Sequence, residues 1–380
     1  RWPNLCISNR NMAEGFVRQE NNTAIKRALP HWQYVGSDNT KWVTSSYPNK
    51  VSSNATVDFI DYPYRHVAVS PHQQKLRLAQ ALANGGGLDY YLIGRLDNHE
   101  DRSGYAPVKE IFAFHAENEE SYLGLRSKAN VGLINGALAN QGEFRGWFRF
   151  LLEGHYLFDT IMEPMALDLD WTQYDTLILP DFQPVSDTLA KRLDDFVAAG
   201  GTLIASGRSS FCDEAFEARA LPALNCLGMT SLAMVREDMT SSYFQFEDKS
   251  NFTRFEDVDL IYMDGPYVYA DYNDSVERRL RLIPPHNFGP PERCYYELVT
   301  DEPGLLINRF GEGQAVYIPW LPGALFHRQG YPNTSEFIAD VLANVAGVAS
   351  VDGNLSPMVE VTHYISEEGF DLIHLVNGSG

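Results

Sequence analysis

The sequence lacks several features that define whole classes of protein. Among its 380 residues there are four cysteines, at positions 6, 212, 226 and 294, and they form no C-x-x-C pair. Neither a zinc knuckle nor a dense disulfide framework is therefore supported. Long apolar runs are also missing, because none approaches the ~18 to 20 residues that a transmembrane helix needs.

Positive charge is scarce as well. Thirty Lys and Arg stand against fifty Asp and Glu, which gives a formal net charge of −20. A field of this sign repels phosphate backbones and anionic lipid headgroups. We therefore expect a soluble protein that binds neither nucleic acid nor membranes.

The pattern of apolar residues indicates an α/β fold. Short apolar runs alternate with helical stretches, as in a parallel sheet with crossover helices, and the length suggests two to three domains. Strands are predicted at residues 4–9, 15–20, 55–61 and 88–97 of the first third. The segment 71–87 predicts a helix with Leu76, Ala79, Leu82 and Ala83 on its inner face and a glycine stop.

Two later segments also have clear patterns. Residues 186–205 predict an N-capping Ser186, a helix with an apolar face, a Gly200-Gly201 stop and a buried strand. From Val351 onward the apolar residues alternate at period two around Glu368-Gly369, which is typical of a β-hairpin.

The segment "YDTLILPDFQPVSDTLAKRLDDFVAAGGTLIASG" (174–207) resembles the middle domain of family 42 β-galactosidases, known as the β-galactosidase trimerisation domain. The stretches "FVRQENN", "VDFIDYPYR" and "RLAQALANGGGLDYYLIG" are similar to the last strands and helices of a glycosidase TIM barrel. The resemblance implies three parts: a C-terminal portion of a TIM barrel (1–126), a flavodoxin-like, amidotransferase-like domain (127–349), and the start of a small β-domain (350–380).

Class I glutamine amidotransferases share the fold of this middle domain, and active members carry a Cys after the strand that Thr202–Ala205 would form. Here Ser206 and Gly207 stand at that place, and no His-x-Glu pair completes a catalytic set. The sequence "LIASG" also fails the G-x-S-x-G pattern of a serine hydrolase. We expect this domain to assemble subunits or to shape a pocket wall, and the resemblance implies a homo-oligomer, with a trimer as one arrangement.

Reactive groups of a TIM barrel lie at the carboxyl ends of its strands. By that rule Glu20 and Asp61 are the candidate catalytic carboxylates. The candidate substrate-binding residues are Arg18, Tyr64, Arg65, Arg95 and Asp97. Two plainer interpretations stay open, namely an ion pair between Arg18 and Glu20 that closes the barrel rim, and a turn-starting role for Asp61.

Together with these residues, the resemblance implies a two-carboxylate glycosidase that acts on a carbohydrate with retention, which needs carboxyl groups about 5 to 5.5 Å apart. In the resembling enzymes one of them follows an earlier barrel strand, so we expect a truncated start and a fragment of a larger enzyme. Two alternatives stay open: a non-catalytic carbohydrate-binding or oligomerisation protein, and an α-L-fucosidase-like hydrolase.

No cofactor and no metal are predicted. The histidines at positions 66, 72, 99 and 115 show neither an HExxH motif nor i, i+4 spacing. The compartment, cytoplasmic or secreted, stays open, because a truncated start would hide any signal peptide.

Overall fold

The computed structural model describes residues 15–21 and 32–379, so the strand predicted at 4–9 lies outside the described residues. The chain forms two compact units. The first contains the described residues up to 129, together with 159–161 and 353–379. The second contains residues 130–158 and 162–352. The three-part division predicted from the sequence stays a prediction.

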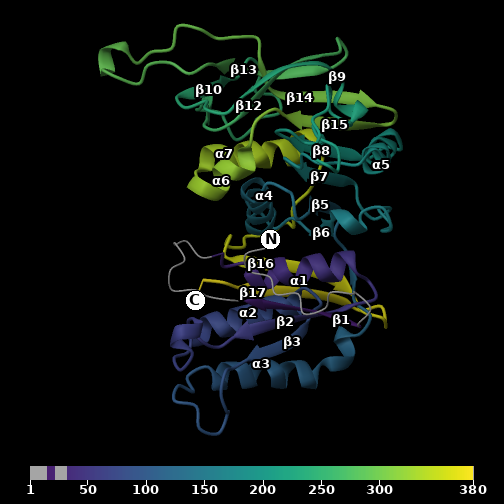
Figure 1. The fold of residues 1–380 in the computed structure, drawn as a ribbon, viewed down its shortest axis with the longest axis vertical. Coiled ribbons are helices and arrows are strands. Elements are labelled where there is room, and N and C mark those ends of the chain that lie inside the picture. The colour runs from purple at the N-terminus through teal and green to yellow at the C-terminus, as the bar shows by residue number, and fades with distance from the viewer. Residues whose placement is uncertain (1–14, 22–31, 380) are drawn as a thin grey trace. The chain divides into compact units, whose positions relative to one another are not determined.

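The first unit is built on a parallel sheet in the order β1-β2-β3 (Figure 1). A helix follows each strand along the chain, as in a segment of a TIM barrel. The elements are β1 (Phe16–Asn21), α1 (Val35–Ser46), β2 (Val51–Val57), α2 (Pro71–Ala83), β3 (Gly87–Tyr91) and α3 (Tyr105–Glu117). The predicted strand 88–97 is wrong at its far end, because β3 ends at Tyr91.

The face of this sheet that packs on the helices is unusually polar. Gln19, Asn21 and Asn54 are fully buried there. Asn39 of α1 donates from Nδ2 to the side-chain oxygens of Asn21 (3.1 Å) and Asn54 (3.2 Å). These hydrogen bonds satisfy the side-chain oxygens of Asn21 and Asn54, which would otherwise be costly to bury.

Helix α2 shows the same polar packing, and one expectation about it is wrong. Leu82 and Ala83 are buried as predicted, but Leu76 and Ala79 are only partly buried. The inner face instead carries Gln74, Arg77, Leu78, Gln80 and Ala81. The spacing of apolar residues could not identify this face, because its polar side chains are buried through hydrogen bonds. Gln74, for example, bonds to Asp58, and Gln80 bonds to Glu360.

The predicted β-hairpin near the end of the sequence is confirmed. Strands β16 (Val359–Ile365) and β17 (Asp371–Asn377) pair antiparallel, and β16 also pairs with β4 (Arg126–Ser127). In Figure 1 these yellow strands lie beside the blue α2, and Thr362 Oγ1 donates to the carbonyl of Ala83 at 2.5 Å. Glu360 is buried and accepts hydrogen bonds from Ser37 and Gln80, and burial raises its pKa to about 7.

A nine-stranded mixed sheet has the order β11-β10-β13-β14-β15-β8-β7-β5-β6, and its strands from β11 to β5 belong to the second unit. Strands β5, β7, β8 and β15 are parallel, and the strands from β14 to β11 continue the sheet antiparallel. The sheet strands are β5 (Val131–Asn135), β6 (Phe158–Met162), β7 (Thr176–Pro180), β8 (Thr202–Ser206), β10 (Ser242–Gln245), β11 (Leu260–Met263), β13 (Glu277–Ile283), β14 (Pro303–Phe310) and β15 (Gly313–Ile318). The α/β fold class predicted from the sequence is confirmed.

Helices and a separate strand pair complete the second unit. They are α4 (Gln141–Glu153), α5 (Asp187–Ala198), α6 (Pro322–Gln329), α7 (Pro332–Asp340) with a π-helical turn (Val341–Val345), and the antiparallel strands β9 (Met229–Arg236) and β12 (Tyr267–Tyr272). Ser186 caps α5 as predicted, since its hydroxyl accepts from the amide of Leu189 at 3.2 Å. Across the described ranges, no helix has the length and apolarity to cross a bilayer.

Helices α4 and α6 pack with their backbones in close contact. A Cβ added to Gly146 of α4 would lie 1.7 Å from the carbonyl oxygen of Gly323 in α6. No side chain larger than hydrogen fits there unless the helices move apart. Gly142 on the same helix has room, because its added Cβ would meet its nearest neighbour atom at 3.4 Å.

We therefore expect Gly146→Ala to lower the free energy of unfolding by about 3 kcal/mol, since overpacking forces the backbone to shift. Gly142→Ala is the matched control and should leave stability unchanged or raise it slightly. Guanidinium unfolding followed by circular dichroism measures both. Equal stability of the two variants would contradict the close packing of α4 and α6.

Candidate active site

The carboxyl ends of β1, β2 and β3 form one edge of the parallel sheet in the first unit. Glu20 lies near the end of β1, Asp58 directly follows β2, and longer loops leave β2 and β3 at the same edge. Ligands of parallel α/β sheets bind at this edge. A catalytic arrangement is therefore expected at this edge.

Arg18 lies between two carboxylates on the sheet face that is opposite the polar helix contacts. Its Nη1 lies 2.9 Å from Glu20 Oε1, and its Nε lies 2.8 Å from Asp89 Oδ2. Ser53 also donates to Asp89 Oδ2, at 3.1 Å. Partial burial lowers the pKa of Arg18, but the bonds to Asp89 and Glu20 outweigh it and raise this pKa above its ordinary value.

The register explains why these groups meet. Glu20 pairs with Ala55, and Ala55 pairs with Asp89, so both carboxylates stand at one level of the sheet. The ion pair between Arg18 and Glu20, considered from the sequence as the plainer interpretation, is observed. Asp89 is not among the residues predicted from the sequence. A third strand that runs to residue 97 places Arg95 and Asp97, rather than Asp89, near its carboxyl end.

Asp58 belongs to the same edge, but its contacts hold neighbouring elements together rather than face a ligand. It is fully buried, and its Oδ1 accepts from Gln74 Nε2 at 2.8 Å and from the hydroxyl of Tyr90. Burial, followed by these interactions with Asp58, raises the pKa of Tyr90 far above its ordinary value. Asp58 thus anchors β3 and α2 to the end of β2.

Asp61 starts the short 3₁₀ helix Tyr62–Tyr64, where its carboxylate accepts from the amide of Tyr62 at 2.8 Å. Arg65 donates from Nη1 to the carbonyl of Tyr62 at 3.4 Å and is exposed, and Tyr64 is half exposed. The turn-starting role considered for Asp61 is therefore observed. This role leaves the aromatic and guanidinium groups of the loop open to solvent.

Arg95 and Asp97 lie in the loop after β3 rather than on the strand. Their side chains are 75% and 64% exposed and form an ion pair with an N–O distance of 2.7 Å. An exposed pair of this kind contributes little to stability. Both residues are free to reach a ligand at the rim.

A cavity of 490 Å³ lies at the opposite edge of this sheet. Its walls include Val51 and Gly87, the first residues of β2 and β3, with His115 and Tyr122. Glu119 is the acidic residue in its wall. The described residues of its wall therefore offer no carboxylate pair, and the chemistry favours the other edge despite the size of this space.

The position of the amidotransferase nucleophile is occupied by a buried hydrogen-bond network in the second unit. Ser206 donates to Glu143 Oε1 at 2.8 Å and accepts from the amide of Asp181 at 3.2 Å. Glu143 also accepts from Trp147 Nε1 (2.8 Å) and from the amide of Ala324 (2.6 Å). Burial raises the pKa of Glu143 to about 7, so between about pH 4.5 and pH 7 this carboxyl group holds a proton that an exposed glutamate would release.

The comparisons with known proteins find similar sequences and structures among the glycosidases. Residues 126–280 match the sequence family described as "Beta-galactosidase trimerisation domain". β-Galactosidase Pbg of Clostridium perfringens is 24% identical over 229 residues, which are 57% of this chain and 29% of that protein. The predicted resemblance to family 42 β-galactosidases is confirmed.

Solved structures show the same fold. The α-L-fucosidase isoenzyme 2 of Paenibacillus thiaminolyticus has a TM-score of 0.69 at 21% identity, over 91% of this chain and 52% of that one. The β-galactosidase of Bacillus circulans sp. alkalophilus has a TM-score of 0.69 at 17% identity, over 95% of this chain and 54% of that one. The chain thus spans about half the length of these solved relatives.

The raised pKa of Glu143 predicts a pH dependence of stability. Between about pH 4.5 and pH 7 the folded state binds a proton that the unfolded state has lost, so the free energy of unfolding falls as pH rises. We expect Glu143→Gln to remove up to ~3 kcal/mol of this fall. Chemical unfolding at pH 5 and pH 7.5 measures it.

The control is Glu214→Gln, an exposed residue of the same unit, which should keep the wild-type difference between the two pH values. Burial also raises the pKa of Glu360, so Glu360 adds to the fall in stability with pH. Because wild type and variant share this contribution, their comparison removes it. An unchanged difference in Glu143→Gln would show that Glu143 is ionised in the folded state.

Proposed function

We propose that this chain is part of a glycoside hydrolase that cleaves a glycosidic bond with retention, and that Glu20 is one of its two carboxylates. The observation that carries the proposal is the position of Glu20. It lies at the carboxyl end of a parallel strand, paired with Arg18 and level with Asp89, in a fold that matches β-galactosidases. Retention requires a second carboxyl group about 5 to 5.5 Å away on the other side of the bond.

Each further residue has a proposed role. Arg18 orients Glu20 through a charge-assisted hydrogen bond and ties it to Asp89. Asp61 is the proposed second carboxylate, held at the rim by the turn that it starts. The substrate-binding roles fall to Tyr64, whose exposed ring can stack on the apolar face of a sugar, and to Arg65, Arg95 and Asp97, which can bind hydroxyl groups.

Replacing Glu20 tests this proposal. We expect Glu20→Gln, in the longest natural form of the protein that contains these residues, to lower kcat on an aryl β-galactoside at least 100-fold. KM should change far less, because the variant keeps the shape of the side chain. Glu110→Gln is the control, since this exposed glutamate of α3 pairs with Lys75. Unchanged turnover in Glu20→Gln would remove Glu20 from the site.

A second candidate activity rests on the likeness to the α-L-fucosidase. The same assay separates the two, with aryl β-galactosides and aryl α-L-fucosides offered to the wild-type protein. Proton NMR of the first-formed sugar shows whether its configuration is retained. Sugar binding by calorimetry without turnover of either substrate would instead favour the non-catalytic alternative.

We also propose that the second unit assembles the protein into a homo-oligomer, supported by the family that residues 126–280 match. Closed rings are the usual outcome of one repeated interface. Light scattering after size-exclusion chromatography at micromolar concentration should give three times the mass of one chain. A mass equal to one chain across a hundredfold range of concentration would overturn this proposal.

A further inference from the structure

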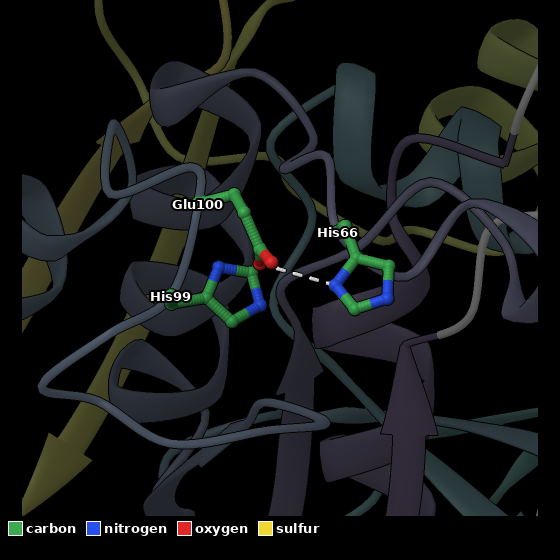
Figure 2. A group of neighbouring side chains, drawn as sticks. All are labelled: His66, His99 and Glu100. Carbon is green, nitrogen blue, oxygen red and sulfur yellow. Dashed lines mark hydrogen bonds and ion pairs between the residues drawn. The ribbon is translucent and has the colours of Figure 1, made fainter.

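Two loops at the carboxyl edge of the first unit bring three metal-ligating side chains together. His66 comes from the loop after β2, and His99 and Glu100 come from the loop after β3. One potential ligand atom from each lies within 4.8 Å of the other two. Figure 2 shows the Glu100 carboxylate between the two imidazole rings, joined by a dashed line to His66.

His99 is held as a metal ligand would be. The residue is 3% exposed, and its Nδ1 lies 2.9 Å from the carbonyl oxygen of Asp101, which can only accept. The proton of the neutral imidazole is therefore on Nδ1, and Nε2 presents a lone pair. Nε2 is buried and has no hydrogen-bond partner among the described residues. A buried unsatisfied nitrogen of this kind requires an explanation, and a metal ion supplies one.

The backbone around His99 is also fixed. Gly94, at φ +138°, packs so closely that an added Cβ would lie 3.2 Å from the His99 ring. Arg102 donates from Nε to the carbonyl of His99 at 3.0 Å. Asp101 accepts from the amide of Ala68 at 2.9 Å, which ties this loop to the loop that carries His66.

The side chains of His66 and Glu100 can move to bind the same cation as His99. His66 Nδ1 and Glu100 Oε2 are already 3.1 Å apart, near the separation of about 3.3 Å between ligands of a tetrahedral zinc ion. Both side chains are mostly exposed, at 57% and 68%, so small rotations bring them to the distance that His99 requires.

We propose that His66, His99 and Glu100 bind a divalent transition-metal ion such as Zn²⁺. Two imidazoles and one carboxylate suit zinc, cobalt, manganese or iron rather than calcium or magnesium. Three protein ligands leave one position open to water or to a hydroxyl group of a ligand. The site is independent of the proposed glycosidase activity, and it lies on the rim loops that also carry Tyr64 and Arg65.

The test is zinc titration of the untagged, chelator-treated protein by calorimetry. We expect one Zn²⁺ per wild-type chain, and binding at least tenfold weaker in His66→Ala and in Glu100→Gln. Both substitutions fall on exposed side chains, so the fold should persist, which circular dichroism verifies. Controls are His72→Ala and Glu110→Gln, an exposed histidine and an exposed glutamate outside the cluster, and both should bind like wild type.

Cobalt gives a second readout. Co²⁺ at a tetrahedral nitrogen and oxygen site absorbs strongly in the visible range, and this absorption should be lost in the two ligand variants but kept in the two controls. The proposal is overturned if the wild type binds no zinc. It is equally overturned if His66→Ala and Glu100→Gln bind zinc as tightly as wild type, since the ions would then lie elsewhere on the acidic surface.

Discussion

Parallel pairing of β1, β2 and β3 is the constraint on which the first unit depends. Parallel strands need a crossover, and the helices that supply it bring every strand back to start at the same edge. The residues at the ends of the strands and the loops after them therefore lie together at the opposite edge. Here they are Glu20, Asp58 and the loops with His66, His99 and Glu100. A change of one residue in register would move Glu20 to the other face of the sheet.

The polar layer between sheet and helices is the second feature that shapes this unit. Asn39, Gln74 and Gln80 occupy positions where leucine would be expected. Each makes a specific hydrogen bond, such as that from Gln74 Nε2 to Asp58, and a hydrogen bond requires far more exact geometry than an apolar contact. This layer therefore specifies the position of α1 and α2 on the sheet more strictly than packing of aliphatic side chains would.

Much of the fold follows from the sequence because the signals are local. Ser186, the apolar face after it and the Gly200-Gly201 stop define α5 within one short segment, and the alternation around Gly369 defines the last hairpin. The pairing of Arg18 with Glu20 follows equally from period two along one strand. Each of these features depends on residues that are close in the chain.

What the sequence could not predict depends on contacts between distant segments. Asp89 meets Arg18 across two strands and 71 positions, and His66 meets Glu100 across 34 positions. Motif spacing cannot detect such pairs. The end of β3 was misplaced for a related reason, because the apolar run beyond Tyr91 has the composition of a strand but leaves the sheet.

The last hairpin has a consequence for how the molecule is made. Its Glu360 accepts hydrogen bonds from Ser37 of α1 and Gln80 of α2. These polar groups of the two helices are therefore satisfied by a residue that follows Gln80 by 280 positions. While the ribosome is still producing the second unit, the earlier helices have no hairpin to cover them. A chain stalled within the second unit would therefore lack Glu360, the hydrogen-bond partner of Ser37 and Gln80.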